Sequence, residues 1–156
     1  MQALMQADKF CYRHVAEQWL AGDPDDAHTG YIQDRLIRYN RTFDQIRTET
    51  IEDSRSQSII LWNHRLFFEV HEHLERVWHQ TDGAENQALK GLIQAAGVYV
   101  HLNFGHQPAA ERLAVKALIR LQKYPDQLTF IDNLAPLLNG LKNLDRSPPY
   151  LMVARR

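Results

Sequence analysis

The chain lacks the features that mark secreted, disulfide-rich and membrane-spanning proteins. It has a single cysteine, Cys11, so no disulfide can form within it, and a lone thiol fits a reducing compartment. Its amino-terminal stretch, MQALMQADKF, contains no apolar run long enough for a signal peptide or a membrane span. We therefore expect a cytoplasmic protein with no membrane contact.

An excess of charge of one sign is also missing. The 18 basic and 19 acidic residues leave a formal net charge of -1, which argues against a generally basic protein that binds nucleic acid. Basic side chains do recur between residues 112 and 123, along one side of a predicted helix, and we interpret them as a solvated face. They are Arg112, Lys116, Arg120 and Lys123.

Strand-like alternation, internal repeats and glycine-rich phosphate loops are absent from the sequence. Apolar residues instead recur at steps of three and four, and glycine or proline separates many of these segments. At 156 residues and 44% hydrophobic content, the chain is long enough for one sizeable core. The sequence therefore predicts an all-α, single-domain helical bundle of about five to six helices. The predicted domain covers residues 1–156, with a helical extension at 1–53 and a tail at 145–156.

Capping and stop signals predict where the helices begin and end. A first helix is expected at about residues 4–21, and Thr29 can cap a second one. Ser54 and Gln57 have capping-box spacing, so a long central helix should run from Ser54 to about Gln80. The remaining helices are expected from Asp82 to Gly105, from Pro108 to Pro125 and from about Leu134 to Leu144.

The central helix contains a polar pair inside its apolar stripe. His71 and Glu75 lie one helical turn apart, on the side of the helix that the large apolar residues occupy. We expect both side chains to lose much of their water, so that each needs a partner: the other side chain, another helix or a cation. The apolar residues of the stripe are Phe67, Val70, Leu74 and Trp78.

A second segment, residues 91–101, is expected to face this pair. Gln94 and His101 are two turns apart on one face, and the small residues between them would let another helix approach closely. His101 would then join His71 and Glu75 across one helix contact. Nitrogen and oxygen ligands on facing helices are a known way to hold a metal in a bundle. The small residues are Ala95, Ala96 and Gly97.

The motif HxxxExx(W/Y), formed by His71, Glu75 and Trp78, resembles the hallmark of an uncharacterised bacterial and archaeal family, the domain of unknown function 309. The resemblance covers about Ile59 to Leu121. It implies a small all-helical fold and a suspected metal site, and it supplies no reaction. The sequence departs from the family pattern at Arg65, where glycine is usual, and at His106, where asparagine is usual. Further matches are Asn63, Glu69, Glu72, Leu74, Gly91, Leu92, Ile93, Gln94, His101 and Gly105.

Two familiar metal motifs do not fit this sequence. The zinc-protease signature HExxH needs a histidine where this chain has Glu75. The Glu-x-x-His motif of di-iron bundles needs a glutamate three residues before each histidine, and Phe68 and Val98 stand at those positions. A standard zinc peptidase and a ferritin-like oxidase are therefore disfavoured.

Three functional hypotheses follow. In the first, His71, Glu75 and His101 bind one divalent cation (zinc, manganese or iron), and Glu72 acts as the general base of a hydrolysis. In the second, the cluster is a structural polar network, and the protein is a helical interaction module that acts through a groove or as a homo-oligomer. In the third, His71 and His101 donate hydrogen bonds to a small organic ligand.

The first hypothesis also assigns residues around the ligands. Gln94 is expected to orient Glu75 or a bound water. The other polar residues of the central helix should face solvent, namely Glu69, His73 and His79. The residues expected around the metal are Gln94, Glu69, Trp78 and Asn63.

Overall fold

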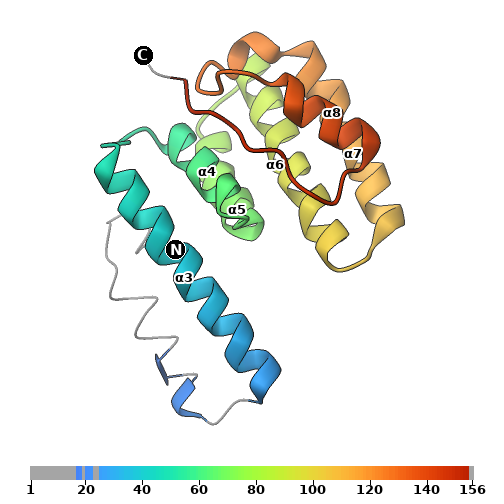
Figure 1. Ribbon diagram of the computed structural model, residues 1–156. Coiled ribbons are helices and arrows are strands. Elements are labelled where there is room, and N and C mark those ends of the chain that lie inside the picture. Colours follow the sequence, from blue (N-terminus) through green and yellow to red (C-terminus); the bar gives the residue numbers. More distant parts are fainter. Residues whose placement is uncertain (1–16, 19, 23–24, 155–156) are drawn as a thin grey trace. The chain divides into compact units, whose positions relative to one another are not determined.

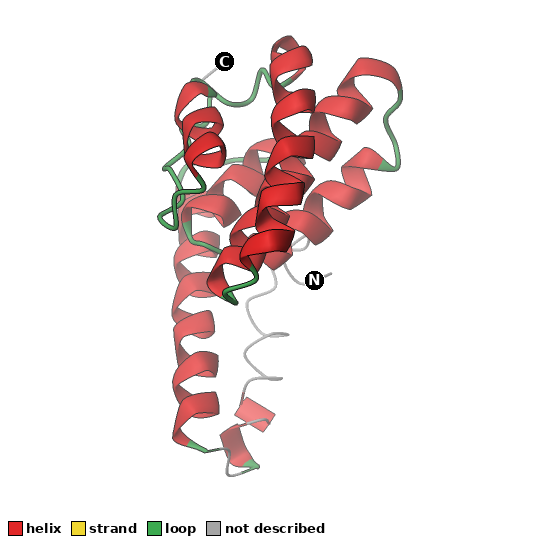
Figure 2. Cartoon of the chain, turned by 90° about the vertical axis from the view of Figure 1, so that its right-hand side faces the viewer, coloured by secondary structure: helices red, strands yellow, loops and turns green. Residues whose placement is uncertain are grey.

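The computed structural model describes residues 17–18, 20–22 and 25–154 (Figure 1). In this part of the chain the secondary structure is helical, with six α-helices and one short 3-10 helix. Figure 2 shows these helices in red, and the all-α fold predicted from the sequence is confirmed. The helices are α3 (Asp26–Thr48), α4 (Ser54–Asn63), α5 (Phe67–Trp78), α6 (Gly83–Asn103), α7 (Gln107–Lys123), η1 (Pro125–Gln127) and α8 (Ala135–Asn143).

The chain divides into two compact units, Met1–Ile51 and Glu52–Arg156. The predicted first helix, at about residues 4–21, lies almost entirely outside the described residues. The single domain predicted for residues 1–156 stays a prediction. None of the described helices has the length and apolar character that crossing a membrane requires.

The described helix of the first unit is α3. The cap predicted at Thr29 is wrong: the carboxylate of Asp25 accepts a hydrogen bond from the backbone N–H of His28 at 2.9 Å. Asp25 therefore caps a helix that begins at Asp26. The polar face of α3 carries an ion pair between Arg38 and Asp34 at 2.7 Å.

The second unit has an aromatic cluster at its centre. The cluster consists of Trp62 from α4, Phe67 from α5 and Tyr99 from α6. Their ring centroids lie 5.1 to 5.3 Å apart. All three residues are buried, and aromatic contacts at this spacing add to the energy of burial. Burial, with the charge of Asp145, raises the pKa of Tyr99 to about 12.

Small residues on α6 bring α7 close. A Cβ atom on Gly91 would lie 3.0 Å from the Cβ of Arg120, and one on Gly97 would lie 3.3 Å from the side chain of Leu113. The face of α6 that carries these glycines is therefore turned toward α7.

The predicted continuous helix from Ser54 to Gln80 is wrong, because the chain turns sharply between α4 and α5. The N–H of Leu66 bonds to the carbonyl of Leu61 at 3.0 Å, and the N–H of Arg65 bonds to that of Trp62 at 2.8 Å. This pair of bonds is a Schellman motif, which requires a left-handed residue, and Arg65 has a φ of 57°. Glycine adopts that conformation without strain, whereas arginine adopts it at a cost in energy.

The helix α4 begins at Ser54, as predicted, but its capping residue differs from the prediction by one position. The carboxylate of Asp53, not the hydroxyl of Ser54, caps this helix by accepting a hydrogen bond from the N–H of Ser56 at 2.9 Å. Burial works to raise the pKa of Asp53, but the hydrogen bonds from Ser56 and Arg55 and the charge of Arg55 outweigh it, so that this pKa is lowered.

The segment after α8 returns to α4. The indole N–H of Trp62 donates to the carbonyl oxygen of Pro149 at 2.9 Å, and the side-chain amide of Asn63 makes two hydrogen bonds to the backbone of Leu151, at 2.8 and 2.9 Å. Figure 1 shows this dark red segment running back from α8. An isolated antiparallel bridge joins Ile131 and Val153 beyond it. The extended tail predicted at 145–156 is thus tied to the core along 149–153.

Candidate metal centre on α5

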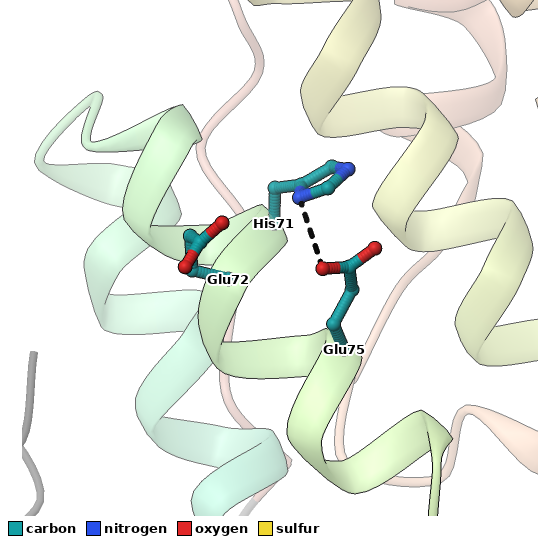
Figure 3. A group of neighbouring side chains, drawn as sticks. All are labelled: His71, Glu72 and Glu75. Carbon is teal, nitrogen blue, oxygen red and sulfur yellow. Dashed lines mark ion pairs between the residues drawn. The ribbon is translucent and has the colours of Figure 1, made fainter.

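Three potential metal ligands lie together on α5. One ligand atom each from His71, Glu72 and Glu75 can be chosen so that all lie within 4.8 Å of one another. The Nδ1 atom of His71 is 3.7 Å from Oε2 of Glu75, one helical turn further on. In Figure 3 these two side chains lie side by side on the flank of α5 nearer α6, and Glu72 extends from the other flank.

The expectation that this pair is buried is wrong. The side chains of His71 and Glu75 are 39% and 40% exposed. The buried side of α5 is centred on Val70 and Leu74, and a residue one position further along is rotated by roughly 100°. His71 and Glu75 therefore lie on the edge of the buried face, where one side of each group reaches water. The buried residues of α5 are Phe67, Glu69, Val70, His73 and Leu74.

The pair contributes little to the stability of the fold. Both side chains are half-exposed, and the 3.7 Å between Nδ1 of His71 and Oε2 of Glu75 is longer than a hydrogen bond. Pairs of this kind are worth about 0–1 kcal/mol. A structural role for His71 and Glu75 is therefore weakly supported by their geometry.

The structure does not bring His101 into this group. His101 follows Tyr99 by two residues, so its side chain leaves α6 about 200° round the helix from the ring that stacks on Phe67 of α5. The face that it shares with Gln94 is turned toward α7, since the side-chain carbonyl of Gln94 accepts a hydrogen bond from Arg120 at 3.2 Å. His101 is half-buried there, with its ring centroid 5.8 Å from that of His106.

Two of the residues expected to face solvent are buried instead. His73 is 3% exposed, and its Nε2 lies 2.9 Å from the carbonyl oxygen of Ser54. Because a carbonyl oxygen can only accept, Nε2 carries the proton and donates it. Burial lowers the pKa of His73, although the contact with Ser54 opposes this. Glu69 is 4% exposed, so the prediction that it points to solvent is also wrong. His79 is exposed, as predicted.

Two residues expected around the metal have structural partners. Asn63 holds Leu151, as described above. Trp78 lies under the ammonium group of Lys90, 5.2 Å from its ring centroid, and its backbone carbonyl accepts a hydrogen bond from Asn86. Trp78 therefore closes the turn between α5 and α6.

The cluster on α5 has the chemistry of a cation site. Zinc lies about 2.0–2.2 Å from imidazole nitrogen and carboxylate oxygen, so two ligand atoms on one ion are roughly 3.0–4.4 Å apart. The 3.7 Å between His71 and Glu75 falls within this range. The ligand atom of Glu72 lies within 4.8 Å of those of His71 and Glu75, and rotation of its side chain would let it reach the same ion. One nitrogen and two carboxylates suit zinc, manganese or iron.

The class of this protein is thus a small all-α fold with a partly exposed cluster of one histidine and two glutamates on one helix. Residues 56–113 match the family model described as Domain of unknown function (DUF309). The resemblance found from the sequence is confirmed over this span. The span includes the three cluster residues and His101. Comparison with curated proteins and with solved structures found no match.

Proposed function

We propose that His71, Glu72 and Glu75 bind one divalent cation, namely zinc, manganese or iron. The observation that supports the proposal is their spacing: among the described residues, they are the one group of three such side chains whose ligand atoms lie within 4.8 Å of one another. Their partial exposure supports it too, because an ion can enter from water without rearrangement of the core. A cytoplasmic location, expected from the lone cysteine, is part of this proposal.

The proposed reaction class is hydrolysis. Three protein ligands leave coordination positions open, and a bound divalent metal supplies a hydroxide nucleophile by lowering the pKa of its water. His71 and Glu75 hold the ion, and Glu72 has one of two roles. It is either the third ligand or, with its side chain turned away from the ion, the general base that takes a proton from the water.

Elemental analysis of the chain, purified without an affinity tag or chelator, tests the proposal. We expect near-stoichiometric metal in the wild-type protein and loss of it in His71→Ala and Glu75→Ala, with the helical circular dichroism unchanged. His79→Ala is the matched control, because it removes an exposed histidine of the same turn region. A wild-type protein that takes up none of the three metals, or variants that retain wild-type stoichiometry, would overturn the proposal.

Two further variants define the ligand set. Loss of metal in Glu72→Ala makes Glu72 a ligand, and retained metal with lost hydrolysis makes it the base. His101→Ala tests the ligand set predicted from the sequence, in which His101 takes the third position. Loss in that variant of the same metal ion that His71→Ala and Glu75→Ala release would favour His101 over Glu72.

The alternative function is docking of an acidic protein segment on α7, and one observation favours it. Val115 and Ile119 are 58% and 61% exposed, one turn apart on the outer face of α7. Arg112, Lys116 and Lys123 lie on the same face, and no carboxylate pairs with them within the described residues. Exposed apolar side chains surrounded by cations are complementary to a partner surface on which apolar side chains are surrounded by carboxylates.

A probe peptide tests this alternative. It is a helical peptide with leucines on one face and glutamates around them, labelled for fluorescence polarisation. Ile119→Ser and Lys116→Glu should each weaken its binding, and Lys142→Glu, on the exposed side of α8, should not. Equal weakening by all three variants would show unspecific charge attraction and refute a docking face on α7.

A further inference from the structure

The end of α6 brings two histidines together through its backbone. The N–H of His106 bonds to the carbonyl of His101 at 2.9 Å, and the N–H of Gly105 bonds to that of Leu102 at 3.1 Å. These bonds form a second Schellman motif, with Gly105 in the left-handed conformation at a φ of 71°. The geometry of this turn is therefore set by backbone hydrogen bonds and by a glycine that suits it.

The same motif places the side chains of His101 and His106 in contact. In a Schellman motif these two positions usually hold apolar residues, which pack on each other across the turn. Here both are imidazoles, with ring centroids 5.8 Å apart and planes inclined at 49°. Within the described part of the chain, neither ring has a hydrogen-bond partner. Two polar rings have thus replaced an apolar contact, and their nitrogen atoms are left available.

We propose that His101 and His106 form a second cation site, which takes a divalent metal with a preference for nitrogen ligands. When each imidazole nitrogen lies about 2.0–2.1 Å from an ion, the two ring centroids are roughly 5–6 Å apart. The observed 5.8 Å matches this spacing. Copper binds such nitrogen pairs most strongly among the first-row divalent metals, followed by zinc and nickel.

This site is separate from the cluster on α5. His101 leaves α6 on the side turned toward α7, and His71 lies on α5. The negative end of α6 and the positive end of α7 meet at this turn and offset each other, so the binding energy comes from the imidazoles. His106 is exposed, which leaves room for waters or an incoming ligand on the ion. The competing explanation is purely aromatic packing, since the ring of Phe104 also lies 6.2 Å from that of His106.

Copper binding to the tag-free full chain tests the proposal. The protein is stripped of metal and carries His71→Ala and Glu75→Ala, so that the first site is removed. CuCl2 is then added in equal molar amount, and pulsed electron paramagnetic resonance counts the imidazoles on the ion. We expect two. His101→Ala and His106→Asn should each reduce the signal to one imidazole and weaken copper binding by about tenfold or more, because the chelating second ligand is lost.

The controls separate this site from other histidines. His79→Ala should leave both the affinity and the two-imidazole signal unchanged, and circular dichroism checks that each variant folds. A two-imidazole signal that survives His106→Asn, or a wild-type affinity in His101→Ala, would overturn the proposal and leave aromatic packing as the role of the pair. Since the first site is absent from this background, failure here says nothing against the cation on α5.

Discussion

The left-handed backbone of Arg65 sets up a direct test of how α4 is separated from α5. Its φ of 57° brings the Cβ atom close to the following carbonyl oxygen, which costs roughly 1–2 kcal/mol. Glycine at this position would remove that strain, but its greater freedom in the unfolded chain costs about 0.4–1 kcal/mol. The side chain of Arg65 is exposed, so its loss removes no buried contact. We expect Arg65→Gly to raise the free energy of unfolding by about 0.5–1 kcal/mol.

Urea unfolding, followed by helical circular dichroism, measures this change. Arg65→Ala keeps the strain and should leave the free energy of unfolding nearly unchanged. Arg112→Gly places glycine in the interior of α7 and should lower that free energy by about 1 kcal/mol. The reasoning is refuted if Arg65→Gly destabilises the protein as Arg112→Gly does, because residue 65 would then have an ordinary right-handed backbone.

Three further changes test the packing of the second unit. Asn63→Ala should lower the free energy of unfolding by about 1–3 kcal/mol in the same urea assay, because it leaves both polar groups of Leu151 unpaired; an unchanged value would show that water replaces the amide. The pKa of His73 is lowered in the folded state, so as pH falls the unfolded chain takes up the proton first. The contribution of His73 to the free energy of unfolding should be complete above about pH 6.5, the ordinary pKa of histidine, and should decline below it. That decline should shrink in His73→Asn. Gly140→Ala should destabilise, since its Cβ would lie 2.8 Å from the hydroxyl of Tyr99, and Tyr99→Phe should relieve part of the loss in the double variant; additive effects would rule the contact out.

The helical character of the chain could be predicted from its sequence, but the rotation of each helix could not. Phe67, Val70 and Leu74 were correctly expected on the buried face of α5. Periodicity shows that residues share a face, but it does not show how wide a face the neighbouring helices cover. For this reason the predicted boundary between the buried and exposed faces of α5 was wrong. His73 is buried, and His71 is two-fifths exposed.

Periodicity also does not show which neighbouring helix covers a given face. Gln94 and His101 were correctly placed on one side of α6, because seven residues make two turns. The sequence contains no signal for which neighbour covers that side, and the structure turns Gln94 toward α7. The pairing of His101 with His106 was within reach, since a helix that ends at Gly105 in a Schellman motif brings those two positions together.

The break at Arg65 was concealed for a different reason. Arginine is a good helix former, so its identity does not mark a break in the helix predicted for residues 54–80. The left-handed turn depends on Leu61 and Leu66, which are 1% and 0% exposed and are buried only once the other helices pack on them. Tertiary contacts therefore override the local preference of the chain here.

The return of the carboxyl-terminal segment to α4 bears on the order of folding. Trp62 and Asn63 bond to residues 87 and 88 positions further along the chain, whereas the contacts between α5 and α6 join consecutive helices. During synthesis the helices can form and pack as they emerge, but α4 cannot complete its hydrogen bonds until Pro149 and Leu151 have left the ribosome. Closing so long a loop is slow compared with helix formation. We therefore expect the attachment of this segment to be the last step in folding of the unit. A nascent chain that stops before Pro149 would then carry His71, Glu72 and Glu75 on an α5 whose neighbour α4 lacks these hydrogen bonds.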